Sequence, residues 1–464
     1  MSAVLADPEV TRRTVRLTEA VEISPKADRS VLTDTTQVSF VPMAAVGAGN
    51  GQIDTSTIRP YAEVKKGYTH FRDGDVLFAK ITPCMENGKM AVAHGLHNGA
   101  GLGSTEFHVL RPRAGVDSRY VYHFVSSAKF RNEAAHHMTG AVGQKRVPVS
   151  FLEQSEIPLP SLHEQRRIVA EIEKQFSRLD QAVASLQRVK AQLKRYKACA
   201  LKAAVEGRLV EIEAERARRE GRGFETGERL LERILETRRS QWEGKGKYKE
   251  PAAPETADLP ELPEGWCWSS TDQLAEVGTG ATPNRSNATF FDGGDIPWVT
   301  SAVVNAPFVD KASELVTRAA LLQTNLTEYP PGTLLVAMYG EGKTRGKCSE
   351  LRITAATNQA LAAVQADPSV RSYLKIFLEH NYEETRKVAS GGVQPNLNLS
   401  LVRAIRVPLP PLREQHRIVA EVDRRLSIVR EVEAEVDANL KRAQALRQAV
   451  LTSAFTRKSF KTRL

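Results

Sequence analysis

Polar side chains able to form hydrogen bonds with DNA bases gather at matching places in the two halves of this 464-residue chain. In the first half they are Lys80, Thr82, Asn87, Lys89, Gln144, Lys145 and Arg146, and in the second half they are Arg285, Asn287, Tyr339, Lys343, Arg345, Lys347, Gln394 and Asn396. Arg and Lys can bind guanine, Asn and Gln can bind adenine, and both groups also bind phosphate. For any one of these residues a solvated loop is the simpler interpretation, but as matched groups they predict contact with DNA.

No familiar catalytic or metal-binding pattern stands beside these loops. Residues 337–344 (AMYGEGKT) come close to a phosphate-binding loop, but Ala337 replaces the first required glycine and Thr344 leads into basic residues instead of a helix. The spacings of His94, His97, His136 and His137 fit no standard metal site. Signatures of serine hydrolases, zinc proteases, dinucleotide-binding proteins and adenine methyltransferases are also missing. The sequence therefore predicts a non-catalytic chain that holds no metal.

A stretch of 15 residues that occurs twice must position these loops. Residues 158–172 (PLPSLHEQRRIVAEI) and 408–422 (PLPPLREQHRIVAEV) agree at 11 of 15 positions, with a constant offset of 250. Such a match indicates an internal duplication. In the domains before the two stretches, a helix expected to start at Asp367-Pro368 parallels one expected after Asp117. We therefore predict two copies of a unit in which a globular domain precedes a long helix.

Each repeated stretch opens a long helical pattern with one narrow apolar stripe. The predicted coiled-coil seam consists of Val169, Ile172, Phe176, Leu179, Val183 and Leu186 in the first copy and Val419, Val422, Leu426, Val429, Val436 and Leu440 in the second. Spacings of three and four residues over several heptads are typical of a coiled coil. Ser161 and Glu164 indicate a capping box at the start of the first helix, expected over about 161–206, and the second helix is expected over about 412–456. Each helix would pair with its own copy; the alternative is two helices packed on separate domains.

The coarse pattern predicts an α+β fold with a pseudo-twofold internal repeat. We expect a first mixed α/β domain at 1–157, a long helix at 158–208, a helical segment and linker at 209–262, a second mixed α/β domain at 263–407 and a second long helix at 408–464. Strands are expected at 76–81, 90–94 and 105–110, and a short amphipathic helix around 230–235. Residues 244–262 are rich in Lys, Pro and Glu, which favours an extended linker.

The composition favours a globular chain with an anionic partner. The formal net charge is +10 and the pI is about 9.4, which is consistent with binding to a polyanion such as DNA. No apolar run reaches the ~18–20 residues of a membrane span. Four scattered cysteines without a CxxC pair, and an N-terminus without a secretory pattern, predict a cytoplasmic protein with free thiols.

The repeated helices resemble those of a known protein family. The pattern Pro-Leu-Pro-x-Leu-x-Glu-Gln-x-Arg-Ile-Val-Ala-Glu, on long helices that each follow a variable domain, is similar to the specificity subunit of type I restriction-modification systems. Residues 262–266 (LPEGW) look like the usual start of a domain in that family, and residues 206–209 (EGRL) like the usual end of its central helix. The resemblance covers nearly the whole chain, although no such start precedes the first domain.

This resemblance implies a division of tasks among several subunits. Each variable domain would be a target recognition domain reading one half of a split double-stranded DNA sequence, and the two helices would pair antiparallel and set the spacing of the halves. Two methyltransferase subunits would dock on the chain and methylate adenine with S-adenosylmethionine, and motor-nuclease subunits would cut DNA using ATP and Mg²⁺. No cofactor is then expected in this chain. Two other interpretations stay open: a coiled-coil scaffold for protein partners that touches no DNA, and an enzyme with an unrecognised nuclease site.

Overall fold

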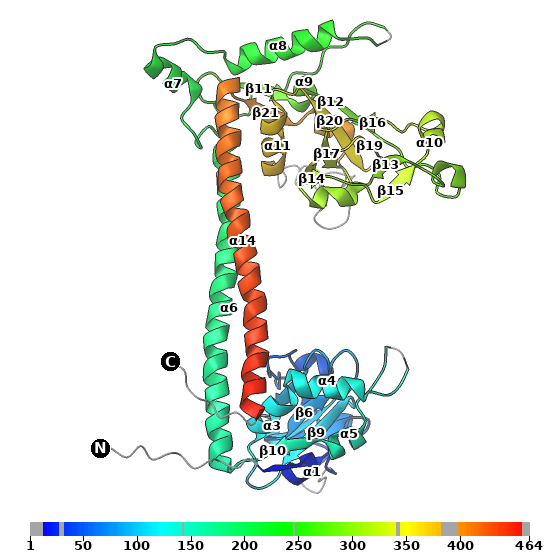
Figure 1. Ribbon diagram of the computed structural model, residues 1–464, viewed down its shortest axis with the longest axis vertical. Helices are drawn as coiled ribbons and strands as arrows, with labels where there is room; N and C mark the ends of the chain where they lie inside the picture. The colour runs from blue at the N-terminus through cyan, green and yellow to red at the C-terminus, as the bar shows by residue number, and fades with distance from the viewer. Residues whose placement is uncertain are drawn as a thin grey trace. The chain divides into compact units, whose positions relative to one another are not determined.

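The computed structural model describes residues 13–26, 32–141, 143–244, 246–339, 344–381 and 397–456. The chain divides into two compact units, and each unit includes part of both long helices (Figure 1). Unit 1 comprises residues 1–188 and 436–464, and unit 2 comprises residues 189–435. Both long helices, α6 (Leu162–Val205) and α14 (Leu412–Phe455), contribute residues to each unit.

Unit 1 contains a domain built on two four-stranded sheets of order β2-β9-β6-β7 and β4-β3-β8-β5, with a further pair β1-β10. Its strands are β1 (Thr14–Arg16), β2 (Val21–Ile23), β3 (Gln37–Val41), β4 (Ile58–Pro60), β5 (Thr69–Arg72), β6 (Val76–Ala79), β7 (Met90–Val92), β8 (Ala100–Gly103), β9 (Phe107–Pro112) and β10 (Glu156–Pro158). Its short helices are α1 (Leu17–Ala20), α2 (Tyr61–Val64), α3 (Ser118–Val125), α4 (Ala128–His136) and α5 (Val149–Gln154). Strand β6 is buried on both faces, since Val76 and Phe78 lie in one apolar core and Leu77 and Ala79 in another.

Most elements expected in the first domain are present. The three expected strands are β6, β7 and β9. Strands β6 and β7 end two residues earlier than expected, and β9 both starts and ends two residues later than expected, at Phe107 and Pro112. The helix expected after Asp117 is α3. Asp117 caps it, because its Oδ1 accepts hydrogen bonds from the backbone amides of Arg119 at 2.9 Å and Tyr120 at 3.2 Å.

Unit 2 contains a domain with sheets of order β12-β20-β17-β18-β14 and β15-β13-β19-β16, with a further pair β11-β21. Its strands are β11 (Cys267–Ser270), β12 (Ala275–Thr279), β13 (Ile296–Val299), β14 (Phe308–Val309), β15 (Glu314–Val316), β16 (Glu328–Tyr329), β17 (Leu334–Ala337), β18 (Cys348–Leu351), β19 (Ala355–Thr357), β20 (Leu361–Ala366) and β21 (Arg406–Leu409). Its helices are α7 (Glu213–Glu220), α8 (Gly227–Ser240), α9 (Thr271–Leu274), α10 (Arg318–Gln323), α11 (Arg371–His380) and α13 (Leu399–Arg403).

The two domains share one topology, which confirms the predicted mixed α/β repeat. Without β14, the orders in unit 2 repeat those in unit 1 strand for strand. The inner pair β3 and β8 is parallel in one domain, as β13 and β19 are in the other. Strand β17 is also buried on both faces, with Leu334 and Val336 in one core and Leu335 and Ala337 in another. The duplication seen in the helices therefore extends through both folds.

Two details differ from the expectation. The helix expected to start at Asp367 starts at Arg371 instead. Asp367 caps a turn, because its Oδ1 accepts from the backbone amide and the hydroxyl of Ser369, and such local hydrogen bonds compete with helix formation. Helix α7 lies within the helical segment expected at 209–262, but it was not expected as a separate helix. Helix α8 corresponds to the short amphipathic helix around 230–235 and buries Leu230 and Ile234. The described part of 244–262 contains no helix or strand.

The long helices have the expected ends. The Ser161 hydroxyl accepts from the backbone amide of Glu164 at 3.4 Å, which is one half of the predicted capping box. The Glu164 carboxylate does not complete the box with the helix start; it pairs with Arg167 at 2.8 Å. Gly207 ends α6 with a φ of +69°, a conformation that glycine adopts easily.

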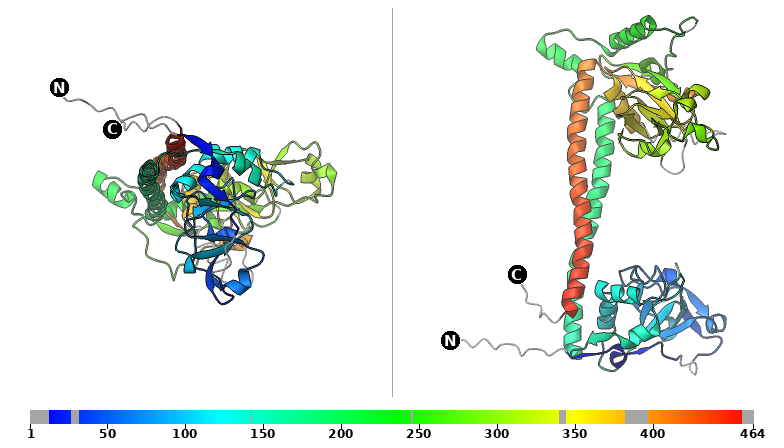
Figure 2. Two further views of the ribbon diagram at one scale, coloured as in Figure 1. Left: turned by 90° about the horizontal axis from the view of Figure 1, so that it is seen from below. Right: turned by 45° about the vertical axis from the view of Figure 1, so that its right-hand side comes forward.

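The two helices pair antiparallel within each unit, side by side in the views of Figures 1 and 2. In unit 1 the guanidinium of Arg447 in α14 lies 4.3 Å from the ring centre of Phe176 in α6 and pairs with Asp180 at 3.1 Å. In unit 2 the first turns of α14 share an apolar core with the last turns of α6, through Ile418, Val422 and Leu426 on one side and Leu201, Ala204 and Val205 on the other. The start of each helix therefore packs on the end of the other.

The predicted seam residues are all withdrawn from solvent to some degree. Val169, Ile172, Val422, Leu426, Val429 and Val436 are buried, and Phe176, Leu179, Val183, Leu186, Val419 and Leu440 are half-buried. Ile168 and Ile418 are also buried, although the seam pattern leaves them out. Near its start each long helix is covered by its own domain as well as by the other helix, so a second apolar row is buried there.

Within the described ranges, no helix is long and apolar enough to cross a membrane. The same residues contain no group of three or more His, Cys, Asp or Glu side chains placed to hold a metal ion.

Candidate nucleic-acid interface

Two candidate loops of the first domain come together at one end of β6. The backbone amide of Val147 donates to the carbonyl oxygen of Lys80 at 2.9 Å, and the amide of Thr82 donates to the carbonyl oxygen of Lys145 at 3.0 Å. The loop after β6 and the loop before α5 are thus held as neighbours by backbone hydrogen bonds. This arrangement gathers Lys80, Thr82, Lys145 and Arg146 in one place, which we call loop pair 1 (residues 80–89 and the described part of 139–147).

The side chains of loop pair 1 differ in how free they are to bind a ligand. Asn87, Gln144 and Lys145 are exposed. Lys89 instead donates from Nζ to the carbonyl oxygen of Met43 at 2.9 Å. The hydroxyl of Thr82 donates to Glu86 at 3.0 Å. The exposed group therefore consists of two amides and one ammonium, which suits hydrogen bonding to base edges and phosphates.

Arg146 is partly committed to a contact inside the domain. Its guanidinium forms an ion pair with the Glu106 carboxylate, with 2.8 Å between Nη2 and Oε1. The hydrogen bonds from Arg146 hold the pKa of Glu106 below its ordinary value, so this carboxylate stays charged at neutral pH. To reach a phosphate, Arg146 must exchange one anionic partner for another.

The corresponding loops of the second domain are held in the same way. The backbone amide of Leu397 donates to the carbonyl oxygen of Met338 at 3.2 Å, as Val147 does to Lys80. We call residues 338–347 and 397–398, in their described part, loop pair 2. Tyr339 in it is exposed, and the ammonium of Lys347 donates to Asn305 Oδ1 at 2.7 Å. Arg345 is half-buried, and its Nε and Nη1 have no hydrogen-bond partner among the described residues. Lys343, Gln394 and Asn396 lie outside the described residues.

Arg285 and Asn287 belong to a different part of the second domain. The Arg285 guanidinium pairs with Glu314 at 2.9 Å and lies 5.4 Å from the ring centre of Trp298. Asn287 caps a short turn, because its Oδ1 accepts from the amide of Thr289 at 3.2 Å and from its hydroxyl at 2.7 Å. These contacts give both side chains a structural task at this loop.

Three residues that support the loops have no signal in the local sequence. Arg131 in α4 donates to the carbonyl oxygen of Glu86, and burial lowers the pKa of its guanidinium. Glu106 and Asn305 hold Arg146 and Lys347 as described above. Each pairing joins segments 40 or more residues apart, so neither spacing nor periodicity could have identified it.

The segment that leads from each domain into the following long helix is held by the same two side chains. Tyr120 donates to the carbonyl oxygen of Pro158 at 2.6 Å, and Tyr373 to that of Pro408 at 2.7 Å. Gln165 and Gln415, both buried, donate from Nε2 to the carbonyl oxygens of Pro160 and Pro410, at 2.8 Å in each case. We call each tyrosine and glutamine pair a domain–helix joint. The repeated sequence thus repeats a connection as well as a helix.

Comparison with known proteins gives one consistent result. The family model described as "Type I restriction modification DNA specificity domain" matches residues 9–195 and 263–438. The EcoEI type I restriction enzyme specificity subunit of Escherichia coli is 27% identical over 466 aligned positions, covering 88% of this chain and 76% of that subunit. The EcoAI specificity subunit of Escherichia coli is 43% identical over 166 residues, but that alignment covers 36% of this chain and only 28% of the relative.

Solved structures agree on the fold. A chain from work on complex assembly and conformational transition of the type I R-M system superposes with a TM-score of 0.71 at 20% identity, covering 96% of this chain and 97% of that one. The HsdS subunit from Thermoanaerobacter tengcongensis gives a TM-score of 0.55 at 23% identity, covering 96% of each chain. The two segments matched by the family model together include both domains and most of both long helices. This chain therefore belongs to the family of type I restriction-modification DNA specificity domains.

Proposed function

We propose that this chain is the sequence-specificity subunit of a type I restriction-modification complex. Loop pair 1 reads one half of a split double-stranded DNA target, and loop pair 2 reads the other half. The observation that carries this proposal is the contrast between the two copies. Their strand orders and domain–helix joints are the same, whereas the side chains on their loop pairs differ. Two copies with a common frame and different loops suit two different half-sites.

The chemistry of the loop pairs supports readout of bases together with phosphate contacts. Asn87 and Gln144 can each offer a donor and an acceptor to an adenine edge. Lys145 is free to neutralise a phosphate, because no hydrogen bond or ion pair of the described residues occupies its ammonium. Arg345, whose Nε and Nη1 have no hydrogen-bond partner within the described ranges, can donate to guanine or phosphate on a small movement of its side chain.

The paired helices are proposed to set the length of the spacer between the half-sites. A helix of 44 residues, such as α6, is about 66 Å long at 1.5 Å per residue. One turn of B-DNA advances about 34 Å, so a helix of this length can relate readers a turn or more apart. Antiparallel pairing of two copies also gives a local twofold relation, which suits reading opposite strands of the duplex.

Catalysis in this proposal belongs to partner subunits. Two methyltransferase subunits dock on the chain and transfer a methyl group from S-adenosylmethionine to adenine, and motor-nuclease subunits supply cleavage with ATP and Mg²⁺. The relatives support the task of this chain, since they are described as specificity subunits. The number of partners and the presence of the nuclease subunit are part of the proposal.

A salt series separates DNA reading from a scaffold that binds only proteins. With the methyltransferase subunit present, affinity for mixed duplex DNA should fall steeply as salt rises, because each neutralised phosphate releases counterions. A flat response would favour the scaffold. In a separate assay, the purified chain alone with Mg²⁺ should leave duplex DNA intact, and cleavage would instead favour a nuclease.

A further inference from the structure

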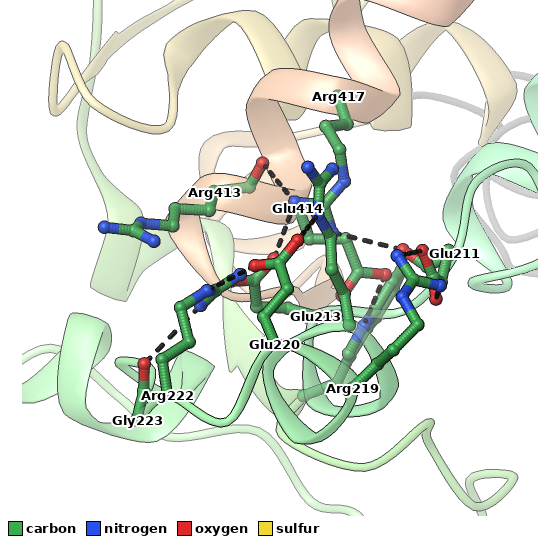
Figure 3. Close-up of polar contacts among 11 residues, drawn as sticks. Glu211, Glu213, Arg219, Glu220, Arg222, Gly223, Arg413, Glu414 and Arg417 are labelled. Atoms are coloured by element: carbon green, nitrogen blue, oxygen red, sulfur yellow. Dashed lines mark hydrogen bonds and ion pairs between the residues drawn. The ribbon is translucent and has the colours of Figure 1, made fainter.

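The end of α6 and the start of α14 are connected by a buried polar network in unit 2. Figure 3 shows most of it, and we call the set Glu213, Arg222, Trp266, Glu414 and Arg417 the latch. The side chains come from three segments: the chain that leaves α6, the beginning of the second domain, and the first turns of α14. Both carboxylates, on Glu213 and Glu414, have an exposed fraction of 0%.

Each carboxylate of the latch has a partner from another segment. Glu414 accepts from the backbone amide of Glu213 at 2.8 Å and from the indole Nε1 of Trp266 at 3.1 Å. Glu213 forms ion pairs with Arg417 at 2.6 Å and with Arg222 at 2.6 Å. Arg417 is on α14, whereas Arg222 follows α7, so Glu213 ties the two together. Buried charges of this kind are costly to leave unpaired.

In the first copy of the repeated sequence, the glutamate at the corresponding place makes a different contact among the described residues. Glu164 occupies the place of Glu414, and it pairs with Arg167 in its own helix at 2.8 Å. The latch depends on residues 211–222, which lie between the two segments matched by the family model. It is therefore a feature of the chain between the copies and not of the repeat itself.

The apolar seam alone selects the register of the helices only weakly. In α14 the seam positions Val422, Val429, Val436 and Ala443 are seven residues apart, and in α6 Ile172, Leu179, Leu186 and Leu193 are also seven apart. A slip of one heptad would replace each apolar side chain by another, while moving one helix about 10 Å along the other. A polar group at a fixed place is a known device for selecting one register among such alternatives.

We propose that the latch holds α6 and α14 in a single axial register. Residues 206–212 connect the end of α6 to Glu213 and are themselves anchored, because Leu209 and Val210 pack on the apolar core of unit 2 and the amide of Arg208 donates to the carbonyl oxygen of Ala203 at 2.9 Å. Fixing Glu213 on the first turns of α14 therefore fixes the offset between the two helices. A heptad slip would separate Glu213 from Arg417 and Glu414 from the Glu213 amide. Glu213 would then keep only Arg222, and Glu414 would lose its backbone donor in a buried place. Glu213 and Glu414 are thus positioning residues. The consequence for the DNA spacer rests on the proposed function; the helix register itself does not.

Distance measurement between spin labels tests the register directly in the full-length chain. Labels are attached at Lys194→Cys in α6 and Ser427→Cys in α14, both exposed and both in unit 2. All labelled proteins also carry Cys84→Ser and Cys199→Ser, which remove two of the native thiols. Cys267 and Cys348 can stay, because burial raises the pKa of Cys267 to about 12 and keeps Cys348 away from the label.

The latch variants are Glu213→Gln, which keeps the shape of the side chain, and the double variant Glu213→Ala with Arg417→Ala. We expect a single narrow distance in the wild type and, in both variants, a second population displaced by about 10 Å or a distribution at least twofold broader. Arg424→Ala in α14 is the matched control. Its ion pair with Glu421 is at 2.8 Å and lies outside the latch, so the distance should not change.

One unchanged narrow distance in a folded Glu213→Gln protein would overturn the proposal, and this milder variant decides the matter if the double variant fails to fold. Methylome sequencing of cells that express the chain with its methyltransferase subunits adds an independent result. The latch variant should keep both half-sites and add targets with a second spacer length. A wild type that methylates no split target would contradict the proposed function. The spin-label distances would still test the helix register, because they do not depend on methylation.

Discussion

The hydroxyl of Tyr373 donates a hydrogen bond of 2.7 Å to the carbonyl oxygen of Pro408, which is the last residue but one of β21. Tyr120 makes the same contact with Pro158 at 2.6 Å. Both tyrosines are buried, and both acceptors open the repeated stretch that leads into a long helix. The same contact therefore holds the junction between a domain and the following long helix in each copy.

Removal of this hydroxyl should destabilise unit 2. Tyr373→Phe leaves the Pro408 carbonyl oxygen buried without its donor, which we expect to lower the free energy of unfolding by about 1–3 kcal/mol. Tyr196→Phe is the matched control, because Tyr196 is on α6 and exposed. Urea denaturation followed by circular dichroism measures both. Equal stability of the two variants would show that the joint contributes nothing.

A second pair of variants tests the packing of α14 on unit 2. Ile418 is 0% exposed and Ile428 is 50% exposed on the same helix. We expect Ile418→Ala to lower the free energy of unfolding by about 2–5 kcal/mol, because it removes three carbons from a closed core. Ile428→Ala should change it by less than about 1 kcal/mol. A comparable loss in both would mean that Ile428 is covered in solution.

The long helices were predictable because their signal is periodic and local. Ser161 and Gly207 placed both ends of α6 within about a residue, and Asp117 identified the start of α3. Polar contacts between distant segments carry no such signal. Glu106 meets Arg146 across 40 residues, and Glu213 meets Arg417 across 204. The error at Asp367 has a local cause, since its side chain caps a turn in competition with the helix.

Lys145 should contribute one phosphate contact to DNA binding. With the methyltransferase subunit present, Lys145→Ala should weaken binding to all duplexes to a similar degree. It should also reduce the slope of log affinity against log salt by about 1. Lys66→Ala, an exposed change in the loop after α2, serves as the control with an unchanged slope. Titration by fluorescence anisotropy at four salt concentrations gives both slopes, and identical slopes would remove Lys145 from the interface.

The buried Glu414 should make stability depend on pH. Burial raises the pKa of Glu414 from 4.5 to about 7, although hydrogen bonds from the Glu213 amide and Trp266 and the charge of Arg417 oppose the rise. Burial also acts on Glu213, but hydrogen bonds from Arg222 and Arg417 outweigh it and lower that pKa, so Glu213 stays ionised over the same range.

An acid whose pKa is higher in the folded state binds its proton more tightly when folded. Its contribution to stability is therefore complete below pH 4.5 and is lost as the pH rises through 7. Between pH 5 and pH 8 we expect the wild type to lose about 2–3 kcal/mol relative to Glu414→Gln, which cannot titrate. Denaturation curves of both proteins at several pH values measure the difference. Parallel pH profiles would show that Glu414 does not titrate in this range.

The most direct test of the proposed spacing function is a four-residue insertion after Gln187 in α6. Four residues add about 6 Å of helix, and coiled coils accommodate insertions of this size as a local change of winding. The measurement is methylome sequencing of cells that express the wild-type or the lengthened chain with its methyltransferase subunits. We predict that both proteins methylate the same two half-sites and that the insertion lengthens the spacer between them. Altered half-sites with an unchanged spacer would contradict this account.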